Sequence, residues 1–190
     1  MNIANKLTIL RIILVPVYIL FLLVDISKYH FCIATLIFVI ASLTDMLDGK
    51  LARKYHLVSD FGKFADPLAD KLLVLSAMIC FVQLGFMPAW ICIIITAREI
   101  AISGLRLVCS GKGVVVAASK LGKFKTVTQM AFIILTTLNL PFYFGASAPG
   151  FCKGVEIFRI ILMYLALLMT IVSFVDYVIK NKDAFSMKDM

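Results

Sequence analysis

Two short segments, TDMLDGKLAR at residues 44–53 and GKFADPLAD at residues 62–70, hold four of the 11 acidic residues of the chain. Asp45 and Asp48 are three positions apart, and Asp66 and Asp70 are four positions apart. On a helix, each of these spacings places both carboxylates on one face. The connection at residues 54–61 is short, which predicts two antiparallel neighbouring helices whose acidic faces meet.

The sequence around these segments is typical of a membrane protein. Of the 190 residues, 62% are hydrophobic and 16% are charged, whereas soluble domains have about 45–50% and about 25%. Apolar stretches lie at residues 7–24, 31–52, 64–86, 88–109, 126–146 and 156–179, and most are near the roughly 20 residues that a spanning helix needs. None alternates like a barrel strand, and backbone in lipid must satisfy its own hydrogen bonds. The prediction is therefore an all-α integral membrane protein with six transmembrane helices, in which residues 1–190 form a single transmembrane domain.

The distribution of basic residues predicts the orientation of these helices. Of the 19 Lys and Arg residues, only Lys28, Lys153 and Arg159 fall on one side of six spans, and the remaining 16 share the side of both termini. Cytoplasmic loops carry the excess of positive charge, so both termini are expected in the cytoplasm (N-in, C-in). Such a basic face attracts anionic membrane lipids. Nucleic acid is not expected as a partner, because the chain has no basic domain to hold it.

The acidic residues predict a metal site. Four carboxylates that converge near a bilayer repel one another and are costly to desolvate, and a bound cation removes both problems. Hard divalent cations prefer oxygen ligands, and paired Mg²⁺ ions recur in phosphoryl transfer. Neither segment contains His or Cys, which favours Mg²⁺ or Mn²⁺, as two ions, over zinc. The alternative is a set of carboxylates that pair with lysines or lie exposed at helix ends.

The pattern D-x2-D-G-x2-A-R-x8-G-x3-D-x3-D resembles the signature of the CDP-alcohol phosphatidyltransferases. All eight of its fixed residues are present: Asp45, Asp48, Gly49, Ala52, Arg53, Gly62, Asp66 and Asp70. The resemblance implies a six-helix bundle, a homodimer, and a cavity open to the cytoplasmic leaflet of a bacterial-type plasma (inner) membrane. It also implies that the four aspartates bind the metal and that Asp70 is the general base.

The remaining motif residues are expected to bind the CDP-lipid. Glycines at positions 49 and 62 allow a ligand to approach the backbone, and the guanidinium of Arg53 can bind two oxygens of a phosphate. Asp48, Gly49, Ala52, Arg53 and Gly62 are thus the predicted donor site. The reaction implied by the resemblance is transfer of a phosphatidyl group from CDP-diacylglycerol to an alcohol, with release of CMP.

Basic residues outside the motif suggest an acceptor that carries its own phosphate. The segments AREI at 97–100, SGLR at 103–106 and ASKLGKFKT at 118–126 resemble family members whose acceptor is glycerol 3-phosphate. Intramembrane charges are functional candidates by default, and Arg98, Arg106, Lys123 and Lys125 are predicted to bind the acceptor phosphate. Two alternatives stay open: Arg98 pairs with Glu99 or with another helix, and the lysines only follow the positive-inside rule.

Three other functions are compatible with parts of the sequence. Within the family, the acceptor could be inositol phosphate or serine. A divalent metal transporter would explain the aspartates, but it would not require the glycines, Arg53 or the basic residues at the cytoplasmic rim. A lipid-binding scaffold without catalysis is the third alternative. Only the enzyme would release CMP.

Overall fold

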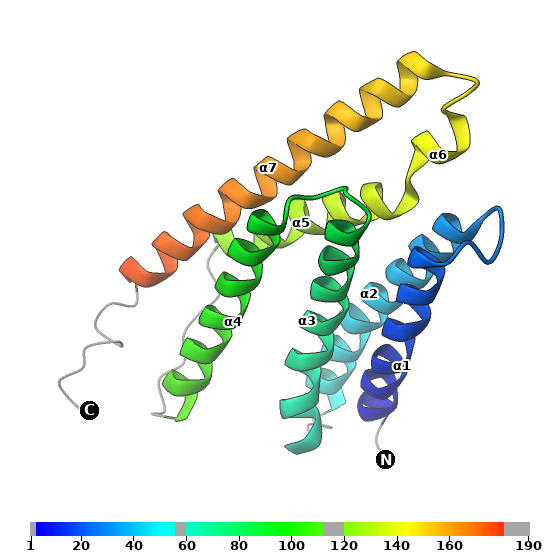
Figure 1. Cartoon of the computed structure of the whole chain (residues 1–190). Helices are drawn as coiled ribbons and strands as arrows, with labels where there is room; N and C mark the ends of the chain where they lie inside the picture. The colour runs from blue at the N-terminus through cyan, green and yellow to red at the C-terminus, as the bar shows by residue number, and fades with distance from the viewer. Residues whose placement is uncertain (1–2, 56–59, 112–119, 181–190) are drawn as a thin grey trace. The chain divides into compact units, whose positions relative to one another are not determined.

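The computed structural model of the protein describes residues 3–55, 60–111 and 120–180, with side chains at residues 7–44, 69, 71–106 and 121–180. Over these ranges the regular secondary structure is entirely helical (Figure 1). The helices are α1 (Ile3–Leu23), α2 (His30–Tyr55), α3 (Asp60–Gln83), α4 (Ala89–Gly111), α5 (Lys120–Leu138), α6 (Leu140–Phe144) and α7 (Pro149–Lys180). The predicted all-α class is confirmed for this part of the chain.

The helices group into two compact units. The first comprises Met1–Met87 and Ile133–Ser147, and the second comprises Pro88–Phe132 and Ala148–Met190. Helix α5 therefore contributes its C-terminal turns to the first unit and its N-terminal turns to the second.

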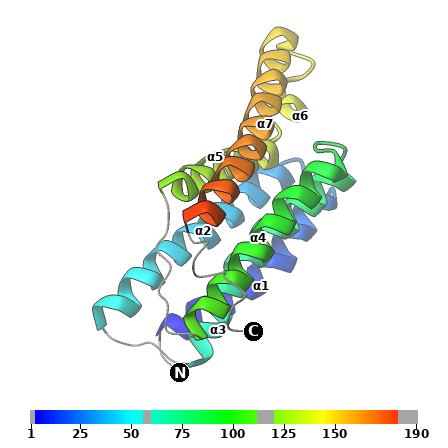
Figure 2. The same ribbon diagram turned by 90° about the vertical axis from the view of Figure 1, so that its left-hand side faces the viewer.

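In the first unit, α1 packs against both α2 and α3 (Figures 1 and 2). Tyr18 of α1 is fully buried, and its ring lies 5.6 Å from that of Phe38 on α2. The Tyr18 hydroxyl is hydrogen-bonded to the hydroxyl of Thr137 at 3.0 Å, which ties the end of α5 to α1. A buried phenol needs such a partner, because an unpaired hydroxyl in an apolar core is destabilising.

A turn around residue 85, at the boundary between the predicted apolar stretches 64–86 and 88–109, separates α3 from α4. Gly85 adopts a φ of 72°, a left-handed conformation that glycine tolerates without strain. The amide of Phe86 donates to the carbonyl of Phe81 at 2.8 Å, and the amide of Gly85 donates to that of Val82 at 3.2 Å. The rings of Phe81 and Phe86 lie 6.4 Å apart. These contacts form a Schellman cap, which satisfies the last carbonyls of α3 and ends the helix.

In the second unit, α4 packs against α7. The buried side of α4 carries Ile91, Ile95 and Ile102 at helical spacing. The buried side of α7 is formed by smaller and more polar residues: Met163, Ala166, Leu167, Thr170, Ser173 and Tyr177. The other side of α7 exposes large apolar residues, among them Ile157, Ile161 and Leu168. An exposed apolar surface of this length suits contact with lipid tails.

Two segments of the described chain are long and apolar enough to cross a bilayer. They are Leu121–Phe144 and Pro149–Lys180. Leu121–Phe144 contains a break, because Asn139 has a φ of 43° and begins the short α6, whose second residue is Pro141. Shorter apolar helical stretches occur at Leu7–Leu23, His30–Thr44 and Lys71–Gln83. The structure thus supports a helical membrane protein.

Candidate active site

The two acidic segments lie in helices that contact each other. Asp45 and Asp48 belong to the C-terminal half of α2, and Asp66 and Asp70 belong to the N-terminal half of α3. Helices α2 and α3 each pack against α1 in the first unit, and they contact each other at few positions. Both segments of the motif are therefore helical, as predicted.

The side chains of the motif lie outside the described residues. This holds for the predicted metal ligands Asp45, Asp48, Asp66 and Asp70, and for the predicted CDP-lipid residues Gly49, Ala52, Arg53 and Gly62. Convergence of the four carboxylates on a metal stays a prediction, and so does the role of Asp70 as general base. The side chains that are described contain no group of three or more metal-ligating residues.

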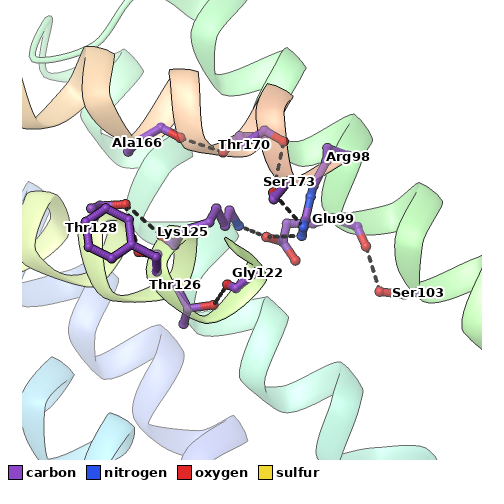
Figure 3. A network of polar contacts seen from close by, with 11 residues as sticks. Arg98, Glu99, Ser103, Gly122, Lys125, Thr126, Thr128, Ala166, Thr170 and Ser173 are labelled. Atoms are coloured by element: carbon purple, nitrogen blue, oxygen red, sulfur yellow. Dashed lines mark hydrogen bonds and ion pairs between the residues drawn. The ribbon is translucent and has the colours of Figure 1, made fainter. Parts of the chain in front are cut away.

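A polar cluster occupies the second unit, and it joins three helices (Figure 3). Arg98 and Glu99 are consecutive residues of α4, Lys125 lies in the first turns of α5, and Ser173 belongs to α7. The amine of Lys125 contacts the carboxylate of Glu99. Nη1 of Arg98 lies 3.6 Å from the same Glu99 oxygen. Nη2 of Arg98 donates a hydrogen bond of 2.9 Å to the Ser173 hydroxyl.

The charged groups of this cluster are largely removed from solvent. The side chain of Lys125 is 3% exposed, that of Arg98 is 13% exposed, and that of Glu99 is 18% exposed. Arg98 lies on the same side of α4 as the buried Ile91, Ile95 and Ile102, because these positions follow one another at three or four residues. Among the described residues, Lys125 and Arg98 lie beside the same carboxylate. Ammonium and guanidinium groups form charge-assisted hydrogen bonds with anions.

The other two predicted acceptor residues have different surroundings. The guanidinium carbon of Arg106 lies 5.7 Å from the centre of the Tyr177 ring, a cation–π distance that joins α4 to α7. Both Arg106 and Lys123 are exposed. The structure therefore brings Arg98 and Lys125 together through Glu99, whereas Arg106 lies on an aromatic ring and Lys123 lies on the surface of α5.

The expected pairing of Arg98 with Glu99 is confirmed as a contact. The sequence does not predict two further contacts, of Lys125 with Glu99 and of Ser173 with Arg98. Glu99 contacts Lys125 more closely than Arg98, and Ser173 is the hydrogen-bond partner of Arg98. The sequence holds a signal for Ser173. Ala166, Thr170, Ser173 and Tyr177 repeat at four, three and four residues, which is the spacing of small and polar residues on one face of a helix.

Comparison with known proteins identifies the family. Residues 1–172 match the CDP-alcohol phosphatidyltransferase family. The chain belongs to this family. It is 42% identical to the CDP-diacylglycerol–glycerol-3-phosphate 3-phosphatidyltransferase of Bacillus subtilis (strain 168), with 96% of each chain covered. It is also 38% identical to the enzyme of the same name from Rickettsia typhi, over 93% of this chain and 94% of the relative.

A third relative has a different name. The chain is 39% identical to a probable phosphatidylglycerophosphate synthase of Mycobacterium tuberculosis (strain H37Rv), over 93% of this chain and 80% of the relative. The resemblance seen in the aspartate motif is therefore confirmed over nearly the whole chain.

A metal-binding role for the aspartate motif agrees with membership of the CDP-alcohol phosphatidyltransferase family. Enzymes of this family generally depend on divalent metals. The donor set of this chain fits that requirement, because four carboxylates supply hard oxygen ligands and both helices that carry them are formed. The polar cluster around Arg98 belongs to the second unit, where Arg98 and Lys125 both lie beside Glu99.

Proposed function

We propose that the protein is a membrane transferase that moves the phosphatidyl group of CDP-diacylglycerol to glycerol 3-phosphate, giving phosphatidylglycerophosphate and CMP for phospholipid biosynthesis. The observation that carries this proposal is the likeness to curated relatives named for this reaction, which extends over 93–96% of the chain. The intact aspartate motif supports it, because all eight signature residues are present at the family spacing.

The four aspartates are proposed to hold two Mg²⁺ or Mn²⁺ ions. Bound ions would neutralise charge on the pyrophosphate of the CDP-lipid. Asp48, Gly49, Ala52, Arg53 and Gly62 seat the CDP group: the small residues admit the nucleotide close to the helix backbone, and Arg53 donates to phosphate oxygens.

The transfer itself exchanges one phosphorus–oxygen bond for another. A hydroxyl oxygen of glycerol 3-phosphate bonds to the phosphorus that bears the diacylglycerol, and the bond from this phosphorus to CMP breaks. Asp70 accepts the hydroxyl proton, and CMP leaves with the bonding electron pair. A carboxylate is a modest base, so holding the hydroxyl in line with the leaving group supplies a large part of the rate.

Arg98 and Lys125 are proposed to bind the phosphate of the acceptor, with Arg106 and Lys123 at the rim. A phosphate monoester carries between one and two negative charges at neutral pH, much like a phosphorylated side chain. The low exposure of Arg98 and Lys125 in the cluster of Figure 3 supports this proposal, since charges interact more strongly where water is excluded. Free serine carries no phosphate and would not require them.

The setting of this reaction follows from the family and from the distribution of charge. We propose six spans with both termini in the cytoplasm, in a bacterial-type inner membrane, with the active site facing the cytoplasm and with anionic lipids around its basic rim. The protein is proposed to act as a homodimer.

An acceptor-omission assay tests the function. Purified protein in lipid nanodiscs receives radiolabelled CDP-diacylglycerol and Mg²⁺, together with glycerol 3-phosphate, inositol phosphate, serine or no acceptor. Release of CMP is expected only with glycerol 3-phosphate. Faster release with another acceptor would contradict the proposed substrate. Uptake of Mn²⁺ into proteoliposomes without CMP release would favour a transporter.

A further inference from the structure

The guanidinium of Arg98 is hydrogen-bonded to a helix that is distant in sequence from its own. Nη2 of Arg98, on α4, donates to the hydroxyl of Ser173, on α7, at 2.9 Å (Figure 3). Ser173 is fully buried, and both residues belong to the second compact unit. In such a site, water competes little for the hydrogen bond, so this contact restricts the orientation of the guanidinium.

The hydroxyl of Ser173 is itself oriented by its own helix. It donates to the backbone carbonyl of Thr170 at 3.1 Å, and the hydroxyl of Thr170 donates to the carbonyl of Ala166 at 2.6 Å. A serine hydroxyl has one hydrogen and two lone pairs. Because its hydrogen is directed to Thr170, a lone pair of Ser173 faces Arg98. Ser173 is thus fixed as an acceptor for the guanidinium.

The remaining donors of Arg98 are only loosely engaged. An arginine has five N–H donors. Nη1 lies 3.6 Å from Glu99, which is an ion-pair distance but too long for a hydrogen bond. Nε is buried and has no hydrogen-bond partner among the described residues. The closer partner of Glu99 is Lys125. Among the described residues, Arg98 therefore retains donors that make no hydrogen bond.

We propose that Ser173 is a positioning residue for the acceptor: it holds the Arg98 fork in the orientation that binds the phosphate of glycerol 3-phosphate. This inference rests on the proposed function and extends it to α7, a helix without any residue of the signature motif. Two hydrogen bonds to phosphate oxygens require a fork of defined orientation. A guanidinium that Ser173 has already oriented loses less rotamer freedom when the acceptor binds.

A purely structural role for Ser173 predicts different behaviour. In that case the Arg98–Ser173 contact would only join α4 to α7, and its loss would lower stability without a selective effect on either substrate. Kinetics with each substrate varied in turn distinguish the two roles, since a positioning residue acts on the Michaelis constant of the acceptor and not on that of the donor.

The test compares Ser173→Ala, Ser173→Thr and Ser103→Ala in the full-length protein in nanodiscs. Loss of one hydrogen bond to the guanidinium is expected to raise the Michaelis constant for glycerol 3-phosphate about threefold to tenfold, with the constant for CDP-diacylglycerol unchanged. Ser173→Thr keeps a hydroxyl and is expected to restore the wild-type value. Ser103 is the matched control, because its hydroxyl donates to a backbone carbonyl of its own helix, that of Glu99, at 2.6 Å and not to another helix. Ser103→Ala is expected to leave both constants unchanged.

A second variant shows whether Ser173 acts through Arg98. In an Arg98→Gln background the guanidinium is absent, so Ser173→Ala is expected to have no further effect on the acceptor constant. The same added increase in both backgrounds would overturn the proposal, and so would an unchanged acceptor constant in Ser173→Ala alone. Failure of the proposed function is recognised separately: in that case the wild-type protein itself releases no CMP when glycerol 3-phosphate is supplied.

Discussion

The amine of Lys125 on α5 contacts the carboxylate of Glu99 on α4, and the lysine side chain in this pair is almost completely buried. Arg98 lies beside the same carboxylate. Among the described residues, this carboxylate lies within ion-pair distance of both cations, and all three side chains are largely shielded from water. The pair has consequences for stability as well as for binding, since the removal of one partner leaves an uncompensated buried charge.

Glu99→Leu is predicted to destabilise the protein strongly. Without the carboxylate, Lys125 and Arg98 repel each other across a short distance, and the expected loss is about 3–5 kcal/mol in the free energy of unfolding. Thermal unfolding in detergent measures this loss. Lys125→Met in the same background removes one of the two charges and is expected to recover part of the stability. A Glu99→Leu protein as stable as the wild type would show that the ion pair makes no net contribution.

Arg98 and Lys123 are predicted to differ in their effect on the acceptor. Arg98 is mostly buried, so Arg98→Gln should cost a charged hydrogen bond, equivalent to a rise of about 10- to 100-fold in the Michaelis constant for glycerol 3-phosphate. Lys123 is exposed and screened by solvent, so Lys123→Gln is expected to raise the constant by about fivefold at most. Steady-state kinetics with each substrate varied in turn provide the comparison. An increase confined to the CDP-diacylglycerol constant would place these residues at the donor instead.

The helices could be predicted from the sequence because their apolar stretches are long and their breaks are distinct. The boundary between the predicted stretches 64–86 and 88–109 agrees with the turn between α3 and α4, where Gly85 and Pro88 lie. The helix ends were less predictable. The last apolar stretch begins at residue 156, whereas α7 begins at Pro149, because Lys153 interrupts the apolar pattern without ending the helix. Hydropathy detects the part of a helix that suits lipid, whereas proline in a first helical turn marks where the helix begins.

The partners of the acceptor residues could be predicted only in part. Arg98 and Glu99 are neighbours in sequence, so their pairing was an evident alternative to phosphate binding. Ser173 is 75 positions from Arg98. The helical period indicates which residues of α7 share a face, but it does not indicate which other helix that face contacts. That information depends on packing between helices, which a single sequence does not contain.

Tyr18 and Thr137 are predicted to contribute to stability and not to catalysis. Their hydroxyls are hydrogen-bonded to each other at 3.0 Å in the core of the first unit. Tyr18→Phe leaves the buried Thr137 hydroxyl without this bond, and the expected loss is about 1–3 kcal/mol in the free energy of unfolding. Adding Thr137→Val removes the second hydroxyl and is expected to recover much of the loss. Both variants should retain the wild-type Michaelis constants. A selective change in either constant would contradict a purely structural role.

Turnover is predicted to require a divalent metal held by the aspartate motif. Asp45 and Asp48 lie on α2 and Asp66 lies on α3, two helices that both pack against α1, and carboxylates are hard oxygen ligands. Asp→Asn at any one of these positions removes a charged ligand, so a higher Mg²⁺ concentration should be needed for half-maximal CMP release, and the maximal rate should fall by orders of magnitude. Excess chelator should abolish wild-type activity, and added Mg²⁺ or Mn²⁺ should restore it. The thermal unfolding temperature in metal-free buffer should change little or rise, because a cluster of like charges is reduced by one. Full activity in chelator, or wild-type Mg²⁺ dependence in all three variants, would contradict the metal site.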